Sequence, residues 1–212
     1  MTALTRRTGG VVALGLLALL LAGCLVDDTN YQDALYKLPE KSRVLVWVDP
    51  RSTADMPVDT APALGQSIAQ DLYTYKVAGT FVAQSRLSAI RQDPKYKEYG
   101  IADVARLTDA DLVVYVDMLT FHVTSLSSGQ LTEGGAEAVI KVVDKNGKRL
   151  WPDNLSALGY PVTAHVDINV SEDQSTSAVR TDLIANMTKK VGQLFHKWDK
   201  GGAIMDHTQK VE

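Results

Sequence analysis

Two unbroken apolar runs stand out along the chain, at residues 44–48 and 112–116. Each is short, rich in valine and bordered by aspartate, and neither alternates with polar positions. A strand that is covered on both faces carries this kind of continuous run. The pattern therefore predicts two central strands, the second of which continues as a more polar strand through Met118, Phe121 and Val123.

Other segments space their apolar residues as helices do. Leu64, Ile68 and Leu72 form one stripe, behind a start near Asp59 and a first-turn proline, Pro62. Residues 79–83 predict a short strand, and 85–91 and 101–107 predict two short helices. The last helix should run for about 20 residues. Its apolar seam is Val179, Leu183, Met187, Val191, Leu194 and Trp198.

The stretch between these helices is typical of antiparallel strands. We expect a loop over 127–135, rich in serine and glycine, and then a strand over 138–143. Asn146-Gly147 predicts a tight hairpin to a return strand at 149–151, since both residue types tolerate positive φ. Strict alternation over 162–170 predicts a strand with one buried and one wet face. The fold class is therefore α/β, an α+β sandwich of mixed sheet, packed helices, antiparallel hairpin extension and a long C-terminal helix.

The first residues predict export and a lipid anchor. Arg6 and Arg7 precede an uncharged run over 9–26, as in a secretory signal. Residues 21–24, Leu-Ala-Gly-Cys, resemble the lipobox of bacterial lipoproteins, which implies cleavage before Cys24 and its acylation with fatty acids such as palmitate. The alternative is an uncleaved membrane helix, for which the run is short because a span needs about 20 apolar residues.

These features divide the chain into four expected parts. They are a signal peptide (1–23), a lipid-anchored tether (24–42), a single α/β domain (43–200) and a flexible tail (201–212). Some residues of the tether, Tyr31, Leu35, Tyr36 and Leu38, are candidates for docking onto the domain. By the sorting rule of the lipoprotein family, Leu25 after the cysteine favours the outer membrane, with the domain in the periplasm.

Composition narrows the possible partners. The formal net charge is −3, and removing the two arginines of the signal makes the mature chain more acidic. Because nucleic-acid binding needs a basic face, we expect no nucleic-acid partner. Cys24 is the one cysteine, so stability must come from packing without disulfides.

A family resemblance follows from the order of these segments. The strand at 44–48, the helix at 64–72, the strand at 80–83 with the turn from Gln84, and the helix at 101–107 lead to Asp109-Ala110-Asp111 and an apolar run. This arrangement resembles the envelope α/β domain of the TolB amino-terminal domain, the curli secretion lipoprotein and the lipoprotein activator of penicillin-binding proteins. Those families typically have glycine where this chain has Asp109. Residues 142–152 are also similar to predicted lipoproteins without assigned activity. The resemblance implies a scaffold for protein contacts and oligomers, with no catalytic residues or cofactor.

Candidate chemistry is sparse. Asp109 and Asp111 are two apart, but aspartates in a helix-to-strand turn more commonly accept backbone hydrogen bonds. His165 and Asp167 share the wet face of one strand, with Asn169 beside them, and are weak candidate metal ligands. His122 has no acidic residue next to it in sequence. His196 falls near a predicted helix C-terminus, where the helix dipole stabilises a cation.

Two stretches are candidate partner contacts. Trp151-Pro152 places an aromatic ring in a loop, and tryptophan is enriched at binding hot spots. The alternative is a tryptophan that covers the edge of the core. The Ser- and Gly-rich loop from Ser125 to Gly135 is the second. We expect a non-catalytic, membrane-anchored periplasmic lipoprotein that binds an envelope protein or itself. The alternatives are an enzyme or metal-binding protein using His165 and Asp167, or a subunit that transports lipid or polysaccharide.

Overall fold

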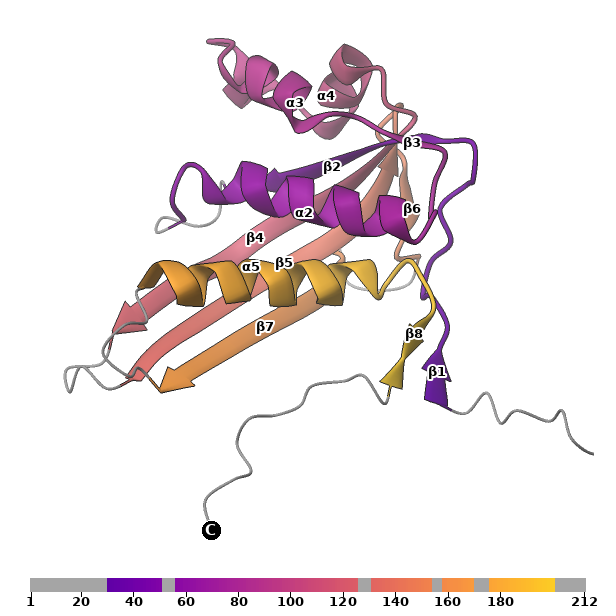
Figure 1. Ribbon diagram of the computed structural model, residues 1–212. Helices are drawn as coiled ribbons and strands as arrows, with labels where there is room; N and C mark the ends of the chain where they lie inside the picture. The colour runs from indigo at the N-terminus through magenta and orange to yellow at the C-terminus, as the bar shows by residue number, and fades with distance from the viewer. Residues whose placement is uncertain (1–29, 51–55, 126–130, 154–157, 170–175, 201–212) are drawn as a thin grey trace, which may run out of the picture. The chain divides into compact units, whose positions relative to one another are not determined.

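The computed structural model describes residues 30–50, 56–125, 131–153, 158–169 and 176–200 (Figure 1). The chain divides into a larger unit, Asp33–Trp198, and a smaller one that takes in the two ends. Strand β1 (Tyr31–Gln32) pairs with β8 (Trp198–Asp199) in a two-stranded sheet. The signal at 1–23, Cys24 and the tail at 201–212 lie outside the described residues. None of the described helices is both long enough and apolar enough to cross a bilayer.

The larger unit is built on a mixed sheet of six strands. These are β2 (Arg43–Asp49), β3 (Thr80–Phe81), β4 (Leu112–Ser125), β5 (Leu131–Asp144), β6 (Arg149–Trp151) and β7 (Tyr160–Asn169). The order is β3-β2-β4-β5-β6, and β7 also pairs with β5. β2 is parallel to β3 and β4, whereas the pairs made by β5 are antiparallel. The predicted α/β class with a mixed sheet is confirmed.

Helices cover both faces of this sheet, but to different extents (Figure 1). α2 (Thr60–Thr74) and α5 (Thr176–Gly192) lie on one face and close the main core. α3 (Gln84–Arg91), the 3-10 turn η2 (Tyr96–Glu98) and α4 (Ile101–Thr108) lie on the other face. There they pack on Leu45, Trp47, Val113 and Tyr115 of β2 and β4. This double cover is the reason that β2 and the start of β4 read as unbroken apolar runs.

The prediction of a loop over 127–135 is wrong for the second half of that range. Residues 131–135 belong to β5, which pairs with β4 through to Ser125 and Thr132. The glycines that suggested a loop make room for neighbours on opposite faces of the strand. A Cβ on Gly134 would lie 2.9 Å from Cγ1 of Val179 in α5, and one on Gly135 would overlap the ring of His122. Gly134 and Gly135 are therefore strand residues chosen for close packing.

The predicted extent of the last helix is also wrong, because α5 ends at Gly192. The chain then turns. The N–H of Leu194 donates a hydrogen bond to the carbonyl of Val191 at 3.1 Å, and the N–H of Phe195 donates to that of Gly192 at 2.8 Å. Leu194 and Phe195 remain buried, so their apolar spacing continues the core without continuing the helix.

Part of the expected tether belongs to the larger unit. Leu38 is buried, and Tyr36 packs against the main core. The backbone N–H of Tyr36 donates to the carbonyl of Leu194 at 3.0 Å. The docking that the apolar residues of this segment suggested is thus found for Tyr36 and Leu38, while Leu35 stays exposed.

Candidate interaction surface

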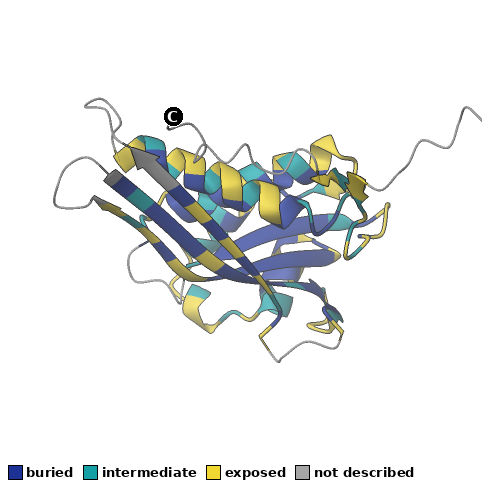
Figure 2. Cartoon of the chain, turned by 90° about the horizontal axis from the view of Figure 1, so that it is seen from below, coloured by how far each residue is buried: buried dark blue, intermediate teal, exposed yellow. Residues whose placement is uncertain are grey.

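Strand β7 presents two different faces, as its alternating sequence predicts. Val162, Ala164 and Val166 are buried in the main core, on the face that α5 covers. Thr163 and His165 are exposed on the opposite face. The alternation of buried and exposed positions can be followed along the long strands in Figure 2.

One edge of β7 pairs with β5, and no strand among the described residues pairs with the other. Two observations show which backbone groups face outward from it. The carbonyl of His165 accepts a hydrogen bond from Nδ2 of Asn186 in α5, at 3.4 Å, so it is not directed at β5 alone. Pro161 lies two pairs away and has no N–H, which an edge strand tolerates only where that group would point away from its neighbour. Positions 161, 163 and 165 therefore turn their backbone groups outward.

On the face of the sheet that α3 and α4 occupy, no described helix covers the far parts of β4, β5 and β7. Leu119 is 39 % exposed there, and His122, Glu137, Thr163 and His165 are exposed as well. We call this region the open face. In the strand register His122 pairs with Gly135, and Gly135 pairs with His165, so two histidines flank one glycine.

Of the two predicted metal ligands, the structure describes the side chain of one. His165 lies on the open face, where its Nε2 is 3.8 Å from Oε1 of Glu133, while the side chain of Asp167 is outside the described residues. Across the described part of the chain, no three His, Cys, Asp or Glu side chains gather closely enough to hold a metal ion. Sequence reasoning missed His122 and Glu133 as neighbours of His165, since both lie on other strands.

The two aspartates after α4 hold the turn into β4. Oδ2 of Asp111 accepts the backbone N–H of Arg43 at 3.1 Å, and Asp109 pairs with the Arg43 guanidinium at 2.8 Å. The bond from Arg43 is the main cause that lowers the pKa of Asp111. Asp109 has φ of 58°, the left-handed conformation that suits the glycine of the families resembled. The structural interpretation of this pair is confirmed for Asp111, whose partner is a backbone donor.

Trp151 is 8 % exposed and Pro152 is buried. The Trp151 ring packs on Tyr36, Tyr160 and Phe195, with centroid distances of 6.0, 5.2 and 5.9 Å. These contacts favour the alternative interpretation, a tryptophan that covers the edge of the core. A partner contact through Trp151 and Pro152 stays a prediction.

We expected His196 near the C-terminus of the last helix, but it lies past the end of α5, in a partly buried cluster. Its side chain is 9 % exposed, and its Nε2 is 3.2 Å from Oδ2 of Asp71. Its Nδ1 is 3.0 Å from the carbonyl of Lys197, and its ring stacks on Tyr75 at 3.7 Å. Burial lowers the pKa of His196, but the bonds to Asp71 and Lys197 outweigh it and raise the pKa. Because both ring nitrogens face oxygen acceptors, the imidazolium satisfies both contacts.

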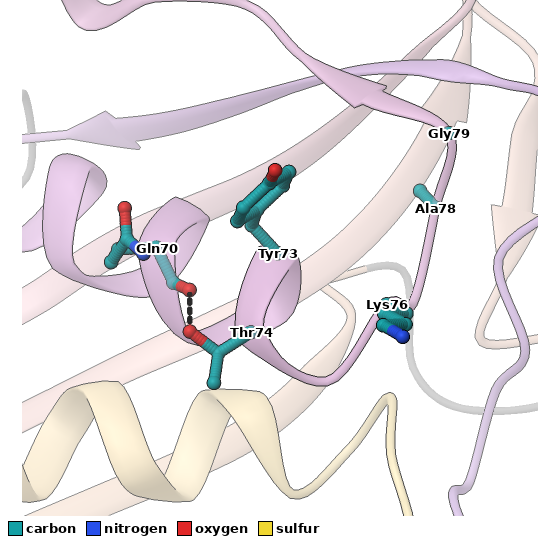
Figure 3. Close-up of a pocket in the computed structure, with 6 residues that line it drawn as sticks. All are labelled: Gln70, Tyr73, Thr74, Lys76, Ala78 and Gly79. Carbon is teal, nitrogen blue, oxygen red and sulfur yellow. Dashed lines mark hydrogen bonds between the residues drawn. The ribbon is translucent and has the colours of Figure 1, made fainter.

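A shallow depression of about 300 Å³ lies at the C-terminal end of α2 (Figure 3). Its lining is Gln70, Tyr73, Thr74, Lys76, Ala78 and Gly79. The side chains drawn in Figure 3 point in different directions, and Thr74 is bonded to the carbonyl of Gln70 at 2.8 Å. Ligand sites instead bring a few polar groups to one point inside an apolar cleft. This depression lacks that arrangement.

No family model and no curated protein sequence matches the chain. Solved structures that resemble it include the PelC dodecamer from Paraburkholderia phytofirmans, at 15 % identity and a TM-score of 0.41, covering 78 % of this chain and 96 % of that one. Lipoprotein GNA1162 from Neisseria meningitidis has 14 % identity and a TM-score of 0.43, with coverage of 72 % and 98 %. An uncharacterized lipoprotein B from Nitrosomonas europaea has 11 % identity and a TM-score of 0.34, with coverage of 76 % and 83 %. Lipoproteins are thus among the structures that the chain resembles, and at these values the likeness concerns the fold and not the activity.

Proposed function

We propose that this protein is a lipid-anchored, non-catalytic module of the bacterial cell envelope that assembles with protein. In this proposal Cys24 carries the acyl chains, and the larger unit faces the periplasm from the outer membrane. Two or more acyl chains, at about 0.8 kcal/mol per buried methylene, hold such a protein on its membrane.

The observation that carries the proposal is the difference between the two sheet faces. One face is closed by α2 and α5, whereas among the described elements the open face has no covering helix, and the outer edge of β7 has no strand beside it and one side-chain contact, from Asn186 to the His165 carbonyl. Exposed surface of this kind, next to a regular strand edge, is a site at which proteins add to one another.

The use of the ionisable side chains supports the non-catalytic part of the proposal. Asp111 holds a turn, Asp144 accepts the N–H groups of Asn146 and Lys148 in the hairpin, and Asp71 holds His196. Each contact stabilises the fold. A catalytic group needs a reactive atom that faces a substrate cavity.

The test is to cross-link cells lightly, extract the lipidated protein in mild detergent and measure the mass of the complex. We expect a complex larger than one chain, either of copies of this protein or with another envelope protein. A protein that stays monomeric after cross-linking and turns over a cell-wall or lipid substrate would overturn the proposal.

A further inference from the structure

We infer that the outer edge of β7 is an interface at which a second copy of this chain adds its own β7 in antiparallel orientation. This inference rests on the proposed function and names its partner. The pairing would join the two sheets through backbone hydrogen bonds along β7 of each copy.

The edge of β7 is long and regular. β7 spans Tyr160–Asn169 and pairs with β5 in an unbroken register, without a bulge. The strands β3 and β6 at the borders of the sheet have two and three residues. β4 pairs with β2 up to Asp117, and past that point its register with β5 is irregular between Met118 and Thr120, so its edge is less regular than that of β7. Proteins usually protect such edges with lysine, proline, bulges or covering elements. Of these devices, β7 has Pro161 at its start and the contact of Asn186 with the His165 carbonyl.

A second copy fits this edge because the two-fold axis of an antiparallel strand pair stands perpendicular to the sheet. Such an axis keeps each face on its own side. Val162, Ala164 and Val166 of both copies then lie on the face covered by the two α5 helices, and Thr163 and His165 of both lie on the open face. The outward-facing positions 161, 163 and 165 are odd-numbered in both copies. In an antiparallel pair about this axis, odd-numbered positions of one β7 lie opposite odd-numbered positions of the other. Thr163 and His165 of each copy therefore lie opposite outward-facing positions of its partner.

The charge of the first seven residues of β7 also suits self-pairing; the one Lys, Arg, Asp or Glu of the strand, Asp167, follows them. Residues 160–166 carry no Lys, Arg, Asp or Glu that would face its equivalent across the axis. Anchoring at Cys24, where it occurs, holds copies on one membrane surface and raises their effective concentration. Weak pairing in solution then becomes extensive pairing on the membrane.

The experiment uses full-length lipidated protein in mild detergent and measures the mass of the complex over a range of concentrations. Thr163→Pro removes an outward N–H. Thr163→Lys places a positive charge at the edge of each copy, close to the same charge of the other copy. Thr124→Lys is the matched control, because Thr124 is also an exposed threonine near the open face but belongs to β4, where it pairs with Glu133 of β5 and lies away from the outer edge of β7. Circular dichroism checks that each variant is folded.

We expect the original protein and Thr124→Lys to form dimers or larger multiples, and both Thr163 variants to dissociate at least tenfold more readily. If Thr163→Pro fails to fold, Thr163→Lys decides. Unchanged assembly of folded Thr163→Lys would overturn the inference, as would an original protein that is monomeric at every concentration. A complex with a different protein, without self-association, would support the proposed function and overturn the assignment of a second copy.

Discussion

Trp151→Ala should cost a large part of the folding free energy. The ring is 8 % exposed and contacts three aromatic rings from different parts of the larger unit. Tyr36 precedes β2, Tyr160 begins β7, and Phe195 follows α5. Replacing a buried Phe or Trp by Ala typically costs about 3–5 kcal/mol, against a total stability of roughly 5–15 kcal/mol. For a unit of this size the expected fall in Tm is roughly 6–20 °C.

The assay is urea denaturation of the full-length protein in mild detergent, followed by far-UV circular dichroism so that the loss of a fluorophore does not matter. Trp198→Ala is the matched control, since Trp198 is partly exposed, and we expect a loss below about 1 kcal/mol. A loss below about 1 kcal/mol for Trp151→Ala as well would refute the assignment of the ring to the core. It would return Trp151 and Pro152 to the role of a partner contact.

Three further predictions concern His196, the glycines of β5 and the anchor. Because the pKa of His196 is raised on folding, the stability that its contact with Asp71 adds is fully present below the unfolded pKa of about 6.5 and is lost as pH rises through the folded pKa. Urea midpoints of the original protein should therefore fall towards those of His196→Gln over that window, and parallel profiles would contradict the assignment. Gly134→Ala should lower the free energy of unfolding by about 1–3 kcal/mol, because the new methyl group would press on buried Val179. Gly135→Ala should lower it less, because the exposed ring of His122 can turn away. Equal losses of stability in thermal melts would count against this packing. Mass spectrometry of the membrane-extracted protein should find acylated Cys24 as its first residue, and an unacylated chain that retains residues 1–23 would favour an uncleaved helix.

The sequence predicted the elements whose causes are local. The apolar runs located β2 and the start of β4 to within a residue, and Asn146-Gly147 located the hairpin, where Gly147 has φ of 86°. The helices at 84–91 and 101–108 also lie where apolar spacing placed them. In each case the residues that determine the element are neighbours along the chain.

The errors have non-local causes. Gly134 and Gly135 suggested a loop because their use depends on Val179 and His122, which belong to other elements. The apolar spacing past Gly192 suggested more helix because Phe195 faces the same core from a turn. Likewise, no spacing along the chain could pair His122 with His165, because the register of two strands with β5 creates that row.

The same limit applies to the interaction surface. Alternation along β7 shows that one face is buried, but a strand has two faces and two edges, and the pattern carries no information about the edges. Whether an edge is free depends on the order of the strands, and here β5 is the single strand with which β7 pairs among the described residues. A search of the sequence for contacts therefore selects conspicuous side chains, such as Trp151. The structure places that ring among other aromatics and leaves backbone groups at the border of the sheet. A partner that recognises backbone groups needs few particular side chains, so the interface can be extensive while the sequence around Thr163 remains unremarkable in composition.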